Sequence, residues 1–182
     1  MHDDIFSGIK AVLGIGQPAG QPAAAWVRFQ DPVGNFVIRY PSGWKFDRDI
    51  AVMEGAYTIS FSSSDGRCTF NIAVDAGLKG GPKTRGGFDF PAYAKAALES
   101  PSSGIYTPVK KSEFRGMPAF RRDYTYHSSG RTYSAGGVMF FTGRAVFSIS
   151  WNAPEREKNK FDALYQRMLE SLIILPGLMR QS

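Results

Sequence analysis

The stretch GLKGGPKT, residues 77–84, comes close to a phosphate-binding loop and follows an expected strand. Such a loop needs the pattern GxxxxGK[ST], in which backbone N–H groups surround the phosphates. Pro82 stands where the second glycine belongs, so one donor is missing. The next helix begins only after Gly87, so no helix N-terminus faces the anion. We therefore expect no nucleotide hydrolysis, and interpret residues 77–87 as either a basic contact for an acidic partner or simply a solvated loop.

Residues that could act as nucleophiles, general bases or metal ligands are scattered along the chain. His2 and His127 are the two histidines, and no GxSxG nucleophile motif accompanies them. His127 precedes a Ser-Ser-Gly turn, which predicts an exposed position at a hairpin tip. Asp47 and Asp49 flank an arginine and are typical of a solvated turn. The sequence thus predicts no catalytic residues, no cofactor site and no metal site.

The single cysteine excludes an intrachain disulfide and a cysteine-cluster metal site. Cys68 alternates with Phe70, Ile72 and Val74, as in a strand with one buried face. A buried thiol in the core is therefore expected rather than a nucleophile.

The chain carries a net charge of +6, without a run of five or more basic residues. This charge suits an acidic partner, an anionic membrane surface or nucleic acid, and equally suits a protein whose charge only keeps it soluble. Strand alternation places Arg121 on the opposite side of its strand from Arg122, Tyr124 and Tyr126, and no RNA-binding motif occurs. We therefore expect no nucleic acid as a partner. We expect the tyrosines to pack under helices and the arginines to face water. The candidate partner-binding residues, for an unknown and perhaps acidic protein, are Lys79, Lys83, Arg85, Arg121 and Arg131.

Period-two patterns dominate the chain after residue 25. Strands are expected at 26–29, 36–40, 50–53, 56–63, 67–75, 105–114, 118–127, 131–142 and 144–151. Helical patterns cover 90–100 and a terminal segment that begins at Asn152-Ala153-Pro154-Glu155 and ends at Pro176-Gly177. Tight turns between successive strands require antiparallel pairing. The separation of strands from helices indicates an α+β fold.

The stretch FVIRYPSGWKF, residues 36–46, places a tryptophan directly after a tight turn. We expect Trp44 and Phe46 to close one end of the core, because an indole brings about 150–250 Å² of burial to a corner. The alternative is an exposed platform for a ligand. Trp151 and Leu169 are expected to be largely buried as well.

The first 25 residues differ in composition from the rest. Residues 3–13 form an expected amphipathic helix with Ile5, Ile9, Val12 and Leu13 on one face, and residues 14–25 form a Gly/Pro/Ala/Gln linker. We assign 1–25 to a helical arm and linker and 26–182 to one domain. The arm can dock on its own domain, exchange with a second copy to form a homodimer, or bind another protein. No apolar run is long enough to cross a membrane, and the acidic start favours a cytoplasmic protein over a signal peptide. The alternative is the mature part of an exported protein, which would have the same pattern.

The order of these patterns resembles the PsbP/Mog1-like superfamily. PSGW after a strand is similar to that superfamily's P-x-GW turn, and residues 114–172 are similar to its ending of long strands, an Ala-Pro helix start and a terminal helix. The resemblance covers about residues 26–175. It implies an α/β/α sandwich with a central antiparallel sheet, and a non-catalytic protein-interaction or assembly module. A small-ligand carrier or sensor, with a pocket between sheet and helix, is the alternative.

Overall fold

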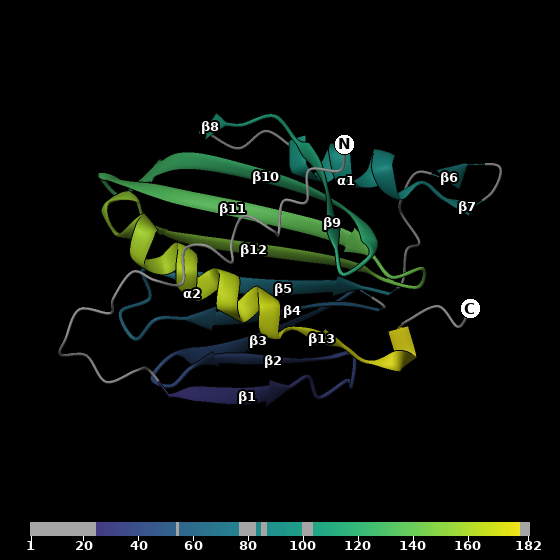
Figure 1. The fold of residues 1–182 in the computed structure, drawn as a ribbon, viewed down its shortest axis with the longest axis horizontal. Helices are drawn as coiled ribbons and strands as arrows, with labels where there is room; N and C mark the ends of the chain where they lie inside the picture. The colour runs from purple at the N-terminus through teal and green to yellow at the C-terminus, as the bar shows by residue number, and fades with distance from the viewer. Residues whose placement is uncertain (1–24, 54, 77–82, 85–86, 100–103, 179–182) are drawn as a thin grey trace.

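The fold was derived from a computed structural model, which describes residues 25–53, 55–76, 83–84, 87–99 and 104–178 (Figure 1). The expected N-terminal helix and linker lie outside the described residues, apart from the linker's last residue. Lys79 and Arg85 also lie outside them.

The described residues form mostly strands, together with two α-helices and short 3-10 turns. The strands are β1 (Trp26–Gln30), β2 (Phe36–Pro41), β3 (Lys45–Met53), β4 (Ala56–Ser62), β5 (Thr69–Asp75), β6 (Lys83–Thr84), β7 (Gly87–Phe88), β8 (Ile105–Tyr106), β9 (Lys110–Phe114), β10 (Met117–Ser128), β11 (Arg131–Phe141), β12 (Val146–Pro154) and β13 (Ile173–Ile174). The helices are α1 (Phe90–Glu99) and α2 (Lys158–Ser171).

The centre of the fold is an open, eight-stranded antiparallel sheet. Its strands follow the order β3-β4-β5-β12-β11-β10-β8, and β9 also pairs with β10. Hairpins build most of it, since β4–β5, β10–β11 and β11–β12 are neighbours both in sequence and in space. The predicted α+β class with antiparallel pairing is confirmed.

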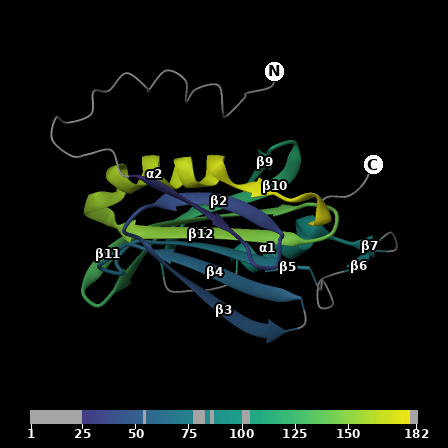
Figure 2. The same cartoon turned by 90° about the horizontal axis from the view of Figure 1, so that it is seen from below.

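Side chains that alternate along the central strands build two separate cores on the two faces of the sheet. Val138 and Phe140 of β11 join the larger core with α2, whereas Met139 between them joins the smaller core with α1. Residues next to each other on a strand point to opposite faces, so the two helices cover opposite sides. The small sheet β1-β2-β13 lies on the α2 side and contributes Phe36 and Ile38 to the larger core (Figure 2). This arrangement is the predicted α/β/α sandwich.

Helix α2 crosses the face of the sheet and packs there through aromatic rings (Figure 1). The ring of Tyr165 is stacked 6.1 Å from Phe70 and lies 6.4 Å from Trp151 and from Trp44, measured between ring centroids. Its hydroxyl donates to the carbonyl of Asn152 at the end of β12. The terminal helix is thus held by ring packing and by one hydrogen bond to the sheet.

Trp44 follows a turn in which its N–H bonds the carbonyl of Pro41 at 3.1 Å. Gly43 has φ +87°, which explains the glycine, because a residue with a Cβ is strained there. Trp44 packs against the core with part of its surface exposed, as do Trp151 and Leu169, so the larger part of each residue is buried, as predicted.

Two expectations for strand β3 were wrong. Phe46 is 53% exposed and covers the core only through its ring contacts with Phe29 and Tyr40, because β3 has a neighbour on one side only among the described strands. Asp47 and Asp49 were expected in a turn but belong to β3. Charged residues are common on such edge strands, where they oppose pairing with other chains.

The strand expected at 105–114 is divided into β8 and β9. Pro108 lies between them and has no N–H for a ladder bond, so the pairing is interrupted there. Both pieces still pair with β10, through Tyr106 opposite Tyr124 and Lys110 opposite Arg121.

Both predicted ends of the terminal helix were also wrong. Ala153 and Pro154 still belong to β12, because Ala153 pairs with Ser134 of β11; a 3-10 turn then leads into α2 at Lys158. At the other end, α2 stops at Ser171 and the chain becomes extended. The β-branched pair of strand β13 then joins β2, so pairing with the small sheet prevails over continuation of the helix.

A buried carboxylate fixes the turn between β1 and β2. Asp31 is 1% exposed and accepts hydrogen bonds from the N–H groups of Val33 (3.2 Å) and Asn35 (3.1 Å). The hydroxyl of Tyr57 on β4 donates to the same carboxylate at 2.5 Å. Burial, together with this acceptor, raises the pKa of Tyr57, so its proton stays on the hydroxyl. The contact joins the small sheet to the large one.

We expect Phe161→Ala to destabilise the protein by about 3–5 kcal/mol, because Phe161 is buried and packs on Trp44 and Tyr165. Leu169→Ala should cost less, since Leu169 is only half-buried. Asn159→Ala, on the exposed side of α2, is the control and should leave the free energy of unfolding nearly unchanged. Urea titration measures all three; equal values for Phe161→Ala and the control would contradict the packing of α2.

We expect Tyr57→Phe to destabilise the protein by about 1.5–3 kcal/mol, because it removes a hydrogen bond to a buried carboxylate. Tyr40→Phe is a matched control: Tyr40 and Tyr57 are each 8% exposed, and the Tyr40 hydroxyl makes no side-chain hydrogen bond to another described residue. Thermal unfolding should show a clear loss for Tyr57→Phe and little change for Tyr40→Phe. Equal melting temperatures for the two variants would show that the Asp31 contact does not tie the sheets together.

Candidate functional site

Two arginines face each other on the small sheet. Arg28 of β1 is directly opposite Arg39 of β2 in the register of the hairpin, and both are exposed. Directly opposed residues of an antiparallel pair have Cβ atoms about 4.5–5.5 Å apart, and like charges at that spacing repel. Among the described residues, neither arginine forms an ion pair. The hairpin therefore holds two uncompensated positive charges side by side.

A third arginine reaches the same hairpin from α2. The guanidinium of Arg167 lies 4.8 Å from the centroid of Trp26, which shares its face of β1 with Arg28 by strand alternation. Trp26 is half-buried against the core. We name Trp26, Arg28, Arg39 and Arg167 the arginine cluster. Its parts come from three elements, and β1 is the outer strand of its sheet.

An open groove of about 270 Å³ lies between α2 and the large sheet, on a different side of the helix. Its floor is Trp151, whose ring lies against Gly136 of the neighbouring strand. A Cβ on Gly136 would come within 2.6 Å of that ring, so only glycine admits the indole in this position. Residues from the sheet and the helix line the groove: Arg121, Trp151, Asp162, Ala163, Tyr165, Gln166 and Leu169.

The charged groups at the rim of the groove have partners within the protein. The guanidinium of Arg121 lies 5.4 Å from the Trp151 ring and pairs with Asp123 at 3.1 Å. Asp162 pairs with Lys158 one turn earlier on α2. Both pairs are about half exposed, so water screens them and they can exchange partners at little cost. The groove thus has an aromatic floor, and the charged residues at its rim can exchange their present ion-pair partners for those of a ligand.

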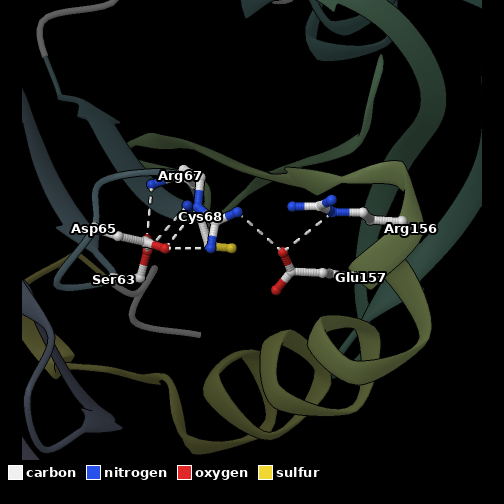
Figure 3. Close-up of polar contacts among 6 residues, drawn as sticks. All are labelled: Ser63, Asp65, Arg67, Cys68, Arg156 and Glu157. Carbon is white, nitrogen blue, oxygen red and sulfur yellow. Dashed lines mark hydrogen bonds and ion pairs between the residues drawn. The ribbon is translucent and has the colours of Figure 1, made fainter. Parts of the chain in front are cut away.

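A polar cluster at the β4–β5 turn contains a serine, a carboxylate and the cysteine (Figure 3). Asp65 accepts from the Ser63 hydroxyl at 2.6 Å and from the Arg67 side chain at 2.6 Å, and these contacts lower the pKa of its carboxyl. Arg67 also pairs with Glu157 at 3.3 Å. The cluster ties this turn to the segment that precedes α2.

Cys68 belongs to that cluster through its backbone N–H, which donates to the Ser63 hydroxyl, but its thiol has the chemistry of a core residue. It is 2% exposed, as predicted, and burial raises the pKa of its thiol to about 11. The thiol is therefore protonated near neutral pH and is a poor nucleophile.

A row of tyrosines occupies the α1 side of the sheet beside the hairpin tip. Tyr106 stacks on Tyr124 at 5.2 Å, and Tyr126 stacks on Tyr133 at 5.3 Å. These tyrosines were expected to pack under a helix; instead they are half-buried against one another, because their ring faces can cover each other across neighbouring strands.

Arg122 was expected to face water freely but has a structural role. Its guanidinium lies 4.1 Å from the centroid of the Tyr106 ring and donates to the carbonyls of Leu98 and Thr107. A cation at the last carbonyls of a helix is favourable, so Arg122 stabilises the C-terminal end of α1. As the alternation predicted, Arg121 lies on the opposite face.

The predicted partner-binding residues do not form one surface among those described. Arg121 lies at the groove, whereas Arg131 lies at the β10–β11 hairpin opposite Ser128, seven residues along the strand or about 24 Å away. Only the backbone of Lys83 is described, paired with Phe88 in a short hairpin. His127 is exposed at its hairpin, as predicted.

Sequence reasoning missed the arginine cluster, although part of the signal was present. The strands expected at 26–29 and 36–40, with a turn between them, imply a hairpin that pairs Arg28 with Arg39 or a near neighbour. No pattern in the sequence predicts the contact of Arg167 with Trp26 or the groove, since both depend on where α2 packs on the sheet.

No group of three or more His, Cys, Asp or Glu side chains could hold a metal ion within the described part of the chain. Neither of its α-helices is long and apolar enough to cross a membrane.

No protein-family model and no curated protein sequence matches the chain. Several solved structures do match. The solution structure of cyanobacterial PsbP from Synechocystis sp. PCC 6803 has a TM-score of 0.56 and 13% sequence identity, and the match covers 88% of this chain and 99% of that one. A crystal structure from Bacteroides thetaiotaomicron has a TM-score of 0.55 and 18% identity over 82% of this chain and 49% of that one.

A third match is LpqN of Mycobacterium tuberculosis, whose structure is described as that of a protein involved in cell envelope biogenesis. It has a TM-score of 0.50 and 9% identity, over 85% of this chain and 93% of that one. At such identities the likeness concerns the backbone and not the residues of any site. The chain therefore has the PsbP-like fold that its sequence resemblance predicted.

Proposed function

We propose that the chain is a non-catalytic protein-interaction or assembly module, and that its arginine cluster binds an acidic surface of a partner protein. The observation that carries this proposal is the register of the β1–β2 hairpin, which places Arg28 directly opposite Arg39. A cytoplasmic location is kept as part of the proposal.

The electrostatic argument rests on the cost of the like-charge pair. Two opposed arginines destabilise a hairpin, and either position could hold a residue that removes the repulsion. A carboxylate from a partner placed between Arg28 and Arg39 would turn repulsion into attraction and could accept two parallel N–H bonds from a guanidinium. Binding an acidic group would therefore remove the repulsion between Arg28 and Arg39 that destabilises the free hairpin.

The composition and place of the cluster suit a protein partner. Tryptophan and arginine are the residues that most often dominate the binding energy of protein interfaces. Trp26 is already positioned by Arg167, so little side-chain freedom would be lost on binding. Among the described strands, β1 also has a neighbour on one side only, so a partner segment could pair with its outer edge. Arg131, at its distant hairpin, would belong to a separate contact.

A small-ligand carrier or sensor is the second candidate, and the groove beneath α2 is the observation that favours it. The carrier hypothesis expects a closed apolar cavity, and ligand pockets commonly measure about 300–1,000 Å³. The groove is open and about 270 Å³, with charged residues at its rim. We therefore rank this function below protein binding.

We expect Arg28→Glu to have opposite effects on stability and binding. It replaces a repulsive cross-strand pair by an attractive one, so the free energy of unfolding should rise by about 0.2–1 kcal/mol. Affinity for the acidic partner should fall at least about tenfold, since an arginine at the contact becomes a carboxylate. The full-length chain is used as bait in native lysate, the captured protein is identified, and its binding is measured by calorimetry alongside thermal unfolding.

Lys95→Glu is the control, because it makes the same charge change at an exposed position on α1, across the sheet. This variant should retain the partner. Native mass spectrometry of the purified chain tests the carrier alternative through any small molecule that remains bound. If Arg28→Glu and Lys95→Glu weaken capture of the partner equally, the arginine cluster is not the binding site. A bound small molecule without a protein partner would favour the carrier function.

A further inference from the structure

We propose that the groove between α2 and the large sheet binds the N-terminal arm, residues 1–13, of the same chain. In this arrangement the arm lays its apolar face on Trp151 and Leu169 and brings Asp3 and Asp4 to Arg121. The inference does not rest on the proposed function, because the arginine cluster and the groove use different sides of α2.

The dimensions of the groove favour peptide side chains as its occupant. At about 270 Å³ it lies below the usual range for small-molecule pockets, and it is open to solvent. Its apolar residues, Trp151 and Leu169, are half-buried. Each therefore has exposed apolar surface that the side chains of a bound peptide could cover. An amphipathic helix in a groove places apolar residues at spacings of three and four, and Ile5, Ile9 and Val12 have these spacings.

The charges of the arm complement one rim of the groove. Arg121 keeps a 46% exposed side chain, and its partner Asp123 is 48% exposed, so this pair can yield to a second carboxylate at small cost. Asp3 and Asp4 lie at the start of the apolar pattern. They can therefore approach Arg121 while the residues that follow cover the aromatic floor.

The described chain begins beside helix α2, whose other side lines the groove. Trp26 is held against Arg167, which lies next to the groove residue Gln166 on α2. The linker 14–25 typically spans about 20 Å, from ~5–6 Å times the square root of its length. Helix α2 has 14 residues and is about 21 Å long. The arm can thus reach any part of the groove from its point of attachment.

Docking also supplies what the arm lacks by itself. A helix of about eleven residues is marginal in water and persists only when its apolar face is packed. A short tether gives the arm an effective concentration near its own groove in the millimolar range, so even a weak contact would be populated. The same argument favours the arm of the same chain over that of a second copy.

The test places a spin label on the polar side of the arm of the full-length chain, with Ser7→Cys. The native Cys68 is buried and its thiol pKa is raised to about 11, so the label reacts at position 7. Proton–nitrogen and methyl NMR spectra then report which signals the label broadens. We expect strong broadening of the Trp151 indole N–H and the Leu169 methyls, with the exposed hairpin at Arg131 unaffected.

Two sets of variants establish the cause. Adding Ile5→Asp and Ile9→Asp should release the arm and restore the Trp151 signal to at least about half its unlabelled intensity. Arg121→Gln should weaken the broadening, whereas Arg131→Gln, the same change about 24 Å away, should not. A mixture of labelled chain with isotope-enriched unlabelled chain should show no broadening at Trp151. Uniform broadening, broadening that survives the double aspartate variant, or broadening in the mixture would each overturn the proposal.

Discussion

The packing of Tyr165 against the sheet is the contact on which the rest of the fold depends. This ring meets residues from three separate parts of the chain: Phe70 on β5, Trp151 on β12 and Trp44 after the first hairpin. Aromatic pairs of this kind add about 0.5–1.5 kcal/mol each beyond the area they bury. The hydroxyl bonds the carbonyl of Asn152, so the ring is satisfied at its polar end as well. The helix that carries Tyr165 is therefore fixed in both position and rotation.

Because α2 cannot rotate, its two sides have different roles. One side, with Gln166 and Leu169, lines the groove over Trp151. Another side directs Arg167 to Trp26 on the small sheet. The packing of α2 on the sheet thus determines the geometry of both candidate sites, although the two sites share no residue.

Charge alone does not distinguish structural arginines from those available to a partner. Arg122 donates to the last carbonyls of α1 and stacks on a tyrosine, and Arg67 joins a turn to the start of α2. Arg28 and Arg39 have the opposite situation, since each is exposed and each has the other as its cross-strand neighbour. An arginine that is repelled by a neighbouring arginine is available to a partner's carboxylate, whereas an arginine already bonded to carbonyl or carboxylate acceptors is not. The sequence does not distinguish these two situations; the contacts in the structure do.

Local pattern determined most of the elements of this protein. Alternation identified the hairpin 56–75 and placed Cys68 inside it, because this pattern depends on residues close in sequence. The sandwich, by contrast, was implied by the resemblance of the order of motifs to the PsbP/Mog1-like superfamily. The ends of α2 could not be predicted, since strand pairing decided them: Ala153 pairs with Ser134 of the preceding strand β11, and Ile173 pairs with Val37 of the distant strand β2. The groove and the contact between Trp26 and Arg167 also required the tertiary structure. Their residues lie far apart in the sequence, and the periodicity within one segment does not determine where a helix packs on a sheet.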